Sequence, residues 1–443
     1  MDKKIIVVAG TIVVVGGGFI AHSMAGKAAE QQIQQGLAAL EAEQDIAVSH
    51  VQTHKNWGNT SVTAHLEAVA NPALGGELAM EVGYLSREAD GSMTFSGDVL
   101  NGVVDFTTEL GSGKRSYTFS ADELTAAEHG LVFEQTEGSG YVDAEREHFA
   151  LNMLTRHMGF ADASGRVQVN GLTTELEHNI DEQGGEGRSH VRFAVDGVTL
   201  EVDDNGRQME AVSLGGAEMY NTATLEGDTL SSRLYLSATD AVFMDSEPGR
   251  AELDITAEGL DYTAFKVVSE ALERNLEDLD AEQALSAEQQ QSLAHNLQAT
   301  LIEQAHTLLA HSPSLHLNTF DMDATLPWFG RLDARLSGSL MFDGEDLPRE
   351  ATSVLLANIN ADMRRAVMQT QGRPSMSLGE AQAELAPRVS AELTVAQLPD
   401  ALVAELPPAF QALLAKDEAP HTFAWESGQP LYNGEPLAKA LAQ

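Results

Sequence analysis

The sequence predicts an α+β protein, made mainly of antiparallel β-sheets with an inserted helical pair and preceded by one N-terminal transmembrane helix. Three observations predict this class. A long uncharged run follows Lys3 and Lys4, and apolar residues alternate with polar ones in several stretches between Val62 and Val395. The apolar period changes to three and four residues near Phe265. We expect an anchor at residues 1–26, a juxtamembrane helix and β-rich domain at 27–262, the helical pair at 263–311 and a C-terminal α+β domain at 312–443.

The uncharged run from Ile5 to Ala21 is the expected anchor. With its neutral extension to Gly26 it can cross a hydrocarbon core of about 30 Å as a helix. A cleavable signal peptide is the alternative, because small residues stand at Ser23 and Ala25, the two positions that a signal peptidase reads. We favour the uncleaved anchor, whose apolar residues are Ile5, Ile6, Val7, Val8, Ile12, Val13, Val14, Val15, Phe19 and Ile20.

The two lysines before the run predict the orientation of the anchor. Positive residues stay in the cytoplasm, so the N-terminus should be cytoplasmic and the rest of the chain periplasmic, at the bacterial inner membrane. Gly17, Ala21 and Ala25 follow one another at a spacing of four, a stripe of small residues that would allow two anchors to associate. An equally good interpretation is that glycine and alanine are common in such segments.

Strands are predicted by alternation between Val62 and Ala70, and then from Val191 onward. We interpret Asp196-Gly197 as the turn of a hairpin, and Asn205-Gly206 as the next reversal. Alternation continues to Ile255 and resumes at Leu315, where a change of parity predicts a bulge near Asn318.

Helical spacing predicts two helices between the two sets of strands, the first from Phe265 to Leu279 and the second from Leu293 to Leu308. A further helix is expected near residues 354–367. After a strand at residues 389–395, the C-terminal part should contain a helix at 400–415, a hairpin at Ser427-Gly428, a turn at Asn433-Gly434 and a short terminal helix.

In this order, the features resemble the YdgA-like family of bacterial envelope proteins, a family of unknown function. The similar segments are the anchor, the turn from Trp57 to Ser61, Leu234 to Phe265, Ser312 to Phe342 and Phe423 to Leu441. Trp57 stands where the family usually has arginine, and a His-Gly-Pro-Phe segment is missing. The resemblance implies an inner-membrane protein that faces the periplasm, and it supplies no catalytic residue.

The charge and the composition exclude several classes of function. Lys and Arg number 26 against 67 Asp and Glu, so the net charge of −41 opposes binding to a phosphate backbone, and we expect no nucleic-acid partner. The absence of cysteine excludes disulfides, thiolate catalysis and cysteine-bound metals.

Each motif that resembles a ligand site lacks a required residue. The loop at residues 201–206 has Val212 where a calcium loop needs glutamate, and residues 111–115 lack the serine or threonine of a phosphate loop. The spacings of His50 with His54, and of His306, His311 and His316, do not place these side chains together. We therefore expect no catalytic, metal-binding or cofactor-binding residue and no cofactor.

We expect a non-enzymatic cell-envelope protein that acts through its sheet surfaces, in protein interaction or in self-association as a homo-oligomer. The alternative is that a sheet groove binds or transfers a lipid or another amphiphile. A periplasmic hydrolase ranks third. These hypotheses differ at Leu336 and Leu340, for which we favour a place in the core over a place in a ligand groove.

Overall fold

The computed structural model describes residues 46–441, apart from segments at 56–58, 69–70, 84–87, 97–99, 110–113, 127–129, 144–147, 163–164, 182–184, 205–206, 245, 281–286, 327–329, 360, 373 and 416–419. In this part of the chain, 21 strands form one sheet, and every paired strand is antiparallel to its neighbour. The predicted class of a mainly antiparallel protein with few helices is therefore confirmed.

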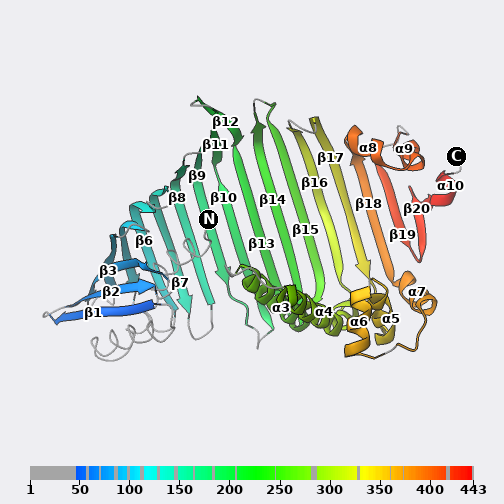
Figure 1. The fold of residues 1–443 in the computed structure, drawn as a ribbon, viewed down its shortest axis with the longest axis horizontal. Helices are drawn as coiled ribbons and strands as arrows, with labels where there is room; N and C mark the ends of the chain where they lie inside the picture. The colour runs from blue at the N-terminus through cyan, green and yellow to red at the C-terminus, as the bar shows by residue number, and fades with distance from the viewer. Residues whose placement is uncertain are drawn as a thin grey trace.

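The strands follow one another across the sheet nearly in chain order, as Figure 1 shows. The first nine are β1 (Ile46–Lys55), β2 (Asn59–Ala68), β3 (Asn71–Gly83), β4 (Glu88–Ser96), β5 (Asn101–Glu109), β6 (Lys114–Ala126), β7 (Leu131–Asp143), β8 (His148–Asp162) and β9 (Gly165–His178). The others are β10 (Glu186–Val195), β11 (Gly197–Asp204), β12 (Arg207–Leu214), β13 (Gly216–Glu226), β14 (Thr229–Phe243), β15 (Gly249–Asp261), β16 (Ser314–Leu326), β17 (Gly330–Phe342), β18 (Val389–Gln397), β19 (His421–Glu426), β20 (Gln429–Tyr432) and β21 (Glu435–Pro436).

The predicted hairpin at Asp196-Gly197 is wrong. β10 and β11 both pair with β9, so they are two parts of one long strand with a bend at Asp196. The apolar residues stand at odd positions before this bend and at even positions after it. Such a change occurs at a bend within one strand as well as at a hairpin turn, so it does not distinguish the two. The next reversal is where the sequence predicts it, because Asp204 pairs with Arg207 across residues 205–206, which lie outside the described residues.

The bulge predicted near Asn318 is confirmed. On β16, Leu317 pairs with Ile255 and Thr319 pairs with Asp254, so Asn318 is the extra residue. The C-terminal elements are confirmed as well: β19 and β20 form a hairpin around residues 427–428, and β21 pairs with β20 across residues 433–434.

The N-terminal strands form the rolled end of the sheet. Side chains of β2 to β6 make one buried cluster that includes Val62, Leu78, Phe95 and Phe119, and Leu151 and Met153 of β8 pack against it. Phe119 lies over Gly138 of β7, where a Cβ would be 2.4 Å from the phenylalanine ring. This end of the sheet is therefore rolled around its own apolar side chains (Figure 1).

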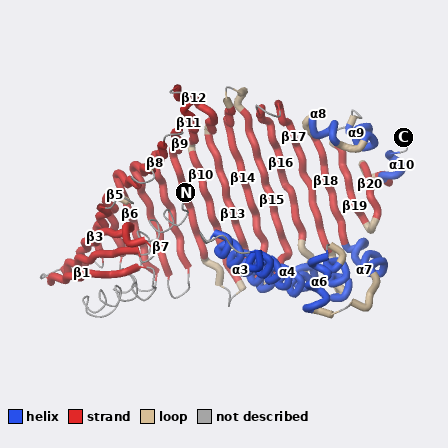
Figure 2. The backbone as a smooth tube through the Cα atoms, in the orientation of Figure 1, coloured by secondary structure: helices blue, strands red, loops and turns tan. Residues whose placement is uncertain are grey.

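The helices lie along the ends of the strands, as Figure 2 shows. They are α3 (Tyr262–Asp280), α4 (Ala287–Ala310), α5 (Arg349–Ala357), α6 (Ala361–Thr370), α7 (Leu378–Leu385), the 3-10 turn η2 (Ala386–Arg388), α8 (Asp400–Glu405), α9 (Pro408–Leu414) and α10 (Leu437–Leu441). The predicted helical pair corresponds to α3 and α4. β15 precedes these two helices in the chain and β16 follows them, and the two strands are hydrogen-bonded neighbours. The sheet is therefore not interrupted by residues 262–312.

Two helices that the sequence predicts as continuous are interrupted. The helix expected at residues 400–415 is α8 and α9, because Pro407 and Pro408 cannot donate the hydrogen bonds of a helix interior. The helix expected near 354–367 is α5 and α6. Asn358 ends α5, and its side chain donates a hydrogen bond of 2.7 Å to the carbonyl oxygen of Val354.

Among the described residues, no helix is both long enough and apolar enough to span a membrane. The expected anchor at 1–26, the juxtamembrane helix that should follow it, and the turn at 57–58 lie outside the described residues. The anchor and its stripe of Gly17, Ala21 and Ala25 stay predictions.

Candidate binding site

The strands from β13 to β18 have two faces of opposite character. Residues that are paired across antiparallel strands point to the same face, and successive residues along a strand point to opposite faces. Met219 pairs with Leu236, Leu236 with Leu253, and Leu253 with Phe320. The same row continues through Leu336 to Val395. We call this face the apolar trough.

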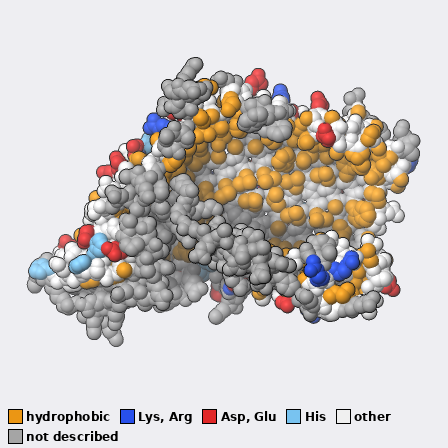
Figure 3. All heavy atoms as spheres, in the orientation of Figure 1, with side chains coloured by type: hydrophobic (Ala, Val, Ile, Leu, Met, Phe, Trp, Pro, Cys, Tyr) orange, Lys and Arg blue, Asp and Glu red, His pale blue; other side chains and the backbone are white. Residues whose placement is uncertain are grey.

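No ionisable side chain of the paired residues on β13 to β18 points into the trough, and all these positions are described. Figure 3 shows the hydrophobic side chains gathered over these strands. The paired residues on this face are Ala217, Met219, Asn221, Ala223, Leu225, Leu230, Ser232, Leu234, Leu236, Ala238, Ala241, Gly249, Ala251, Leu253, Ile255, Ala257, Leu260, Leu315, Leu317, Phe320, Met322, Ala324, Leu326, Gly330, Leu332, Ala334, Leu336, Gly338, Leu340, Phe342, Val389, Ala391, Leu393 and Val395.

The trough is open in its middle part. Phe193 of β10 is 38% exposed and Met219 is 41% exposed, and both line a hollow of about 430 Å³ with Leu236, Leu253 and Phe320. Farther along the trough, Leu340 is 48% exposed. The expected core position of Leu340 is therefore wrong, because the described helices do not cover this part of β17. Leu336 is half-buried.

The opposite face carries the charged residues of the same strands, joined in pairs across the sheet. Arg233 donates two hydrogen bonds to Asp254, of 2.9 and 2.8 Å, and this guanidinium lowers the pKa of the Asp254 carboxyl. On the neighbouring strand β10, Arg192 lies between Glu175 of β9, at 2.8 Å, and Glu218 of β13, at 2.6 Å. Opposite charges at these distances compensate one another, so this face is suited to water.

A second hollow, of about 420 Å³, lies on this charged face. Arg192 and Arg233 line it together with Tyr220, whose ring stacks on Tyr235 at 4.9 Å between centroids. Both arginines are already paired with carboxylates, as described above, so their charge is compensated. The arrangement is that of a cross-strand ladder, and we do not assign a ligand to it.

The trough ends at the rolled N-terminal strands. Tyr117 of β6 is in the row that runs through Gly140, Leu151 and Leu176 to Val191 of β10. Burial raises the pKa of Tyr117 to about 12, and its hydroxyl donates to the carbonyl oxygen of Ala150 at 3.2 Å. Side chains therefore fill the trough at this end, and its open part begins near β10.

The two groups of histidines whose spacings resemble metal sites lie in different parts of the fold. His50 and His54 are on β1, His306 is on α4, and His316 is on β16. The structure instead places His311 beside Asp261 and Asp228, with one ligand atom of each within 4.8 Å of the others. Sequence spacing missed this group because its members come from three separate segments of the chain.

The group of Asp228, Asp261 and His311 has a structural role in the described contacts. Asp261 accepts a hydrogen bond of 2.7 Å from the backbone of Ala264 and so caps α3, and its other oxygen is 3.1 Å from Nε2 of His311. These contacts attach the beginning of α3 to the end of α4. The three side chains are the described residues best placed to hold a metal ion.

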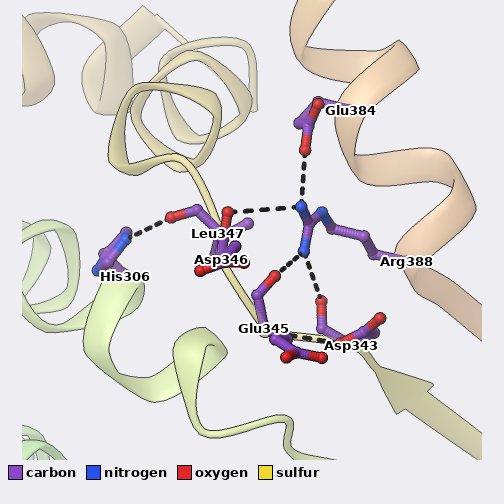
Figure 4. Close-up of polar contacts among 7 residues, drawn as sticks. All are labelled: His306, Asp343, Glu345, Asp346, Leu347, Glu384 and Arg388. Carbon is purple, nitrogen blue, oxygen red and sulfur yellow. Dashed lines mark hydrogen bonds and ion pairs between the residues drawn. The ribbon is translucent and has the colours of Figure 1, made fainter.

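A polar cluster at the base of β17 and β18 is also structural (Figure 4). Arg388 donates to Glu384 at 2.7 Å and to the backbone oxygens of Asp343, Glu345 and Asp346. Its donors thus hold the segment that leaves β17. Arg388 joins two segments of the chain, because its donors are directed at main-chain oxygens after β17 and at the carboxylate of Glu384 on the preceding helix, α7.

A family model described as a bacterial protein of unknown function, DUF945, matches residues 99–406. The match covers most of the chain. The chain belongs to the DUF945 family. The matched region contains β5 to β18, so the trough of this DUF945 protein lies inside it. No curated protein and no solved structure matches the chain.

Proposed function

We propose that this DUF945 protein is a non-enzymatic envelope protein that holds the acyl chains of a lipid or another amphiphile in the apolar trough. The observation that carries the proposal is an open sheet face with no ionisable side chain among its paired residues from β13 to β18. Acyl chains need such a surface because they form no hydrogen bonds.

The dimensions of the trough support this choice. Six strands at a spacing of about 4.8 Å span about 24 Å, and the nine residues from Ala217 to Leu225 extend about 27 Å at about 3.4 Å each. The sheet face therefore measures about 650 Å². Part of it is exposed, as at Met219 and Leu340, whereas Leu225, Ala324 and Val395 are buried. The exposed apolar side chains of this face offer favourable contacts to an acyl chain.

A lipid fits the trough better than the protein partner or second copy that we expect from the sequence. Two copies with a net charge of −41 each repel one another, especially at low ionic strength. The middle of the trough is also hollowed around Phe193 and Leu253, a shape that suits flexible chains. Protein interaction through the same face is the second hypothesis, and its outcome is included in the test.

The proposal places the protein at the bacterial inner membrane. Residues 1–26 would anchor it, with the N-terminus in the cytoplasm and the trough in the periplasm, as the resemblance to the YdgA-like family implies. A lipid-binding trough near a membrane would have a direct source of ligand. A reporter fused after Gln443 tests the topology, because a reporter that is active only in the periplasm should be active there.

Photo-crosslinking tests lipid binding. The full chain is reconstituted in vesicles that contain phosphatidylethanolamine with a diazirine in one acyl chain, and crosslinked peptides are mapped by mass spectrometry. We expect labelled peptides from β13 to β17 in addition to those of residues 1–26. Labels confined to residues 1–26 would overturn the proposal. Crosslinks between two copies through trough residues would favour self-association instead.

A further inference from the structure

The turn between α5 and α6 has an unusual surface. Ile359, at this turn, is 61% exposed, the highest value among the described large hydrophobic side chains. Leu355 of α5 and Met368 of α6 are also exposed, at 42% and 45%. The opposite side of α6 is well packed, since Met363, Ala366 and Val367 are in a buried cluster with Ile302 of α4. The exposed apolar side chains thus belong to helices whose opposite side is packed against α4.

Two arginines accompany these apolar side chains. Arg364 and Arg365 are both exposed, and Nε of Arg364 donates to the carbonyl oxygen of Ala357 at 3.2 Å, which directs this side chain back toward the turn. Figure 3 shows basic side chains gathered over α6, on the same side of the molecule as the trough. Residues 358–368 contain two arginines against the single carboxylate of Asp362, so this segment has a net charge of +1 in a chain of net charge −41.

Exposed apolar residues beside arginines are typical of surfaces that bind anionic membranes. The apolar side chains enter the boundary between head groups and acyl chains, and the guanidinium groups bind phosphates. Each basic residue near an anionic surface contributes about fivefold in affinity. The net negative charge of the chain is repelled by the same surface, which favours an approach through a locally basic edge.

We propose that the α5–α6 turn docks the protein on an anionic membrane surface. Ile359 enters the head-group region, while Arg364 and Arg365 bind lipid phosphates. This inference rests on the proposed function, because docking would bring one end of the trough to the lipids that it holds. α5 follows the end of β17, one of the six strands of the trough, so the turn and the trough are close in the chain.

A fluorescence experiment tests the docking. The chain contains no cysteine, so Ile359→Cys provides a single site for an environment-sensitive dye. Leu402→Cys is the matched control, because Leu402 is 54% exposed on α8, which follows the opposite end of β18. The full chain is reconstituted in vesicles of phosphatidylcholine alone, or of phosphatidylcholine with phosphatidylglycerol.

We expect a blue shift of the dye at position 359 in vesicles with phosphatidylglycerol, and a loss of this shift in molar salt. Arg365→Gln in the Ile359→Cys background should require several times more phosphatidylglycerol for the same shift. Equal emission at position 359 in both kinds of vesicle, or the same shift at position 402, would overturn the inference.

The two proposals fail separately. Crosslinked lipid in the trough without a shift at position 359 would refute docking and leave the proposed function in place. A shift at position 359 without crosslinks in the trough would refute the lipid-holding function and support a membrane-docking surface alone.

Discussion

Leu336→Glu should remove bound lipid without unfolding the protein. Leu336 is half-buried in the middle of the trough, between Phe320 and Val395 on the neighbouring strands. Ser337 is the matched control, because it is the next residue of β17 and points to the opposite face, where it pairs with Thr394. Leu336→Glu and Ser337→Glu therefore add the same charge to the same strand, on opposite sides of the sheet.

The expected effect follows from the cost of keeping a carboxylate hydrated. If the new charge keeps water over about four methylene groups of a bound acyl chain, at about 0.8 kcal/mol each, the loss is about 3 kcal/mol. This loss corresponds to an increase of about two orders of magnitude in Kd. Ser337→Glu should leave the Kd for lipid unchanged within about twofold, because its charge lies in water.

Titration of the full chain with a fluorescent fatty acid measures the two dissociation constants, and thermal unfolding provides the control for folding. We expect the two variants to unfold at nearly the same temperature. An equal Kd for the two variants would refute the trough as the binding site. A large drop in the Tm of Leu336→Glu alone would indicate that this residue is in the core, since burying an unpaired charge costs several kcal/mol.

Three further predictions concern stability. Arg233 lowers the pKa of Asp254, so this carboxylate stabilises the fold above about pH 4, and its contribution is lost as the pH falls through the lowered value. Asp254→Asn should reduce the free energy of unfolding by about 2 kcal/mol at pH 7, and the variant and the wild type should become equally stable in acid denaturation. Hydrogen bonds to Glu67 and Glu77 raise the pKa of His65, so His65→Gln should cost about 0.5 kcal/mol at pH 5.5, and the difference should vanish as the pH rises through the raised value. The net charge of −41 predicts a higher Tm in 1 M than in 0.01 M sodium chloride, because the screening length falls from about 30 Å to about 3 Å, and a flat or falling Tm would contradict this.

Alternation of apolar residues was sufficient to predict the class of fold and many strands. Val62, Ala64 and Leu66 alternate in the sequence, and all three are buried on one face of β2. The bend at Asp196 shows the limit of local signals. Asp-Gly is a frequent hairpin turn, but β10 and β11 bind a common neighbour, β9, and this long-range pairing decides the geometry.

The candidate site could be predicted only in part. The alternating pattern of Leu336 and Leu340 is like that of Val62 and Leu66, yet Leu66 is 1% exposed and Leu340 is exposed. The pattern identifies which side chains share a face. Whether that face is covered depends on the rolling of β2 to β6 and on the helices at the strand ends, which are set by residues far away in the chain.

The bulge at Asn318 connects the local sequence to the continuity of the trough. Before the bulge, Leu315 and Leu317 point into the trough, and after it Phe320 and Met322 do so. Without the extra residue, Phe320 and Met322 would point to the charged face, and Asp321 and Asp323 would point into the trough. The side chain of Asn318 holds the bulge through a hydrogen bond of 2.8 Å to Thr256 on the charged face. A single inserted residue thus keeps carboxylates out of the surface on which the proposed function depends.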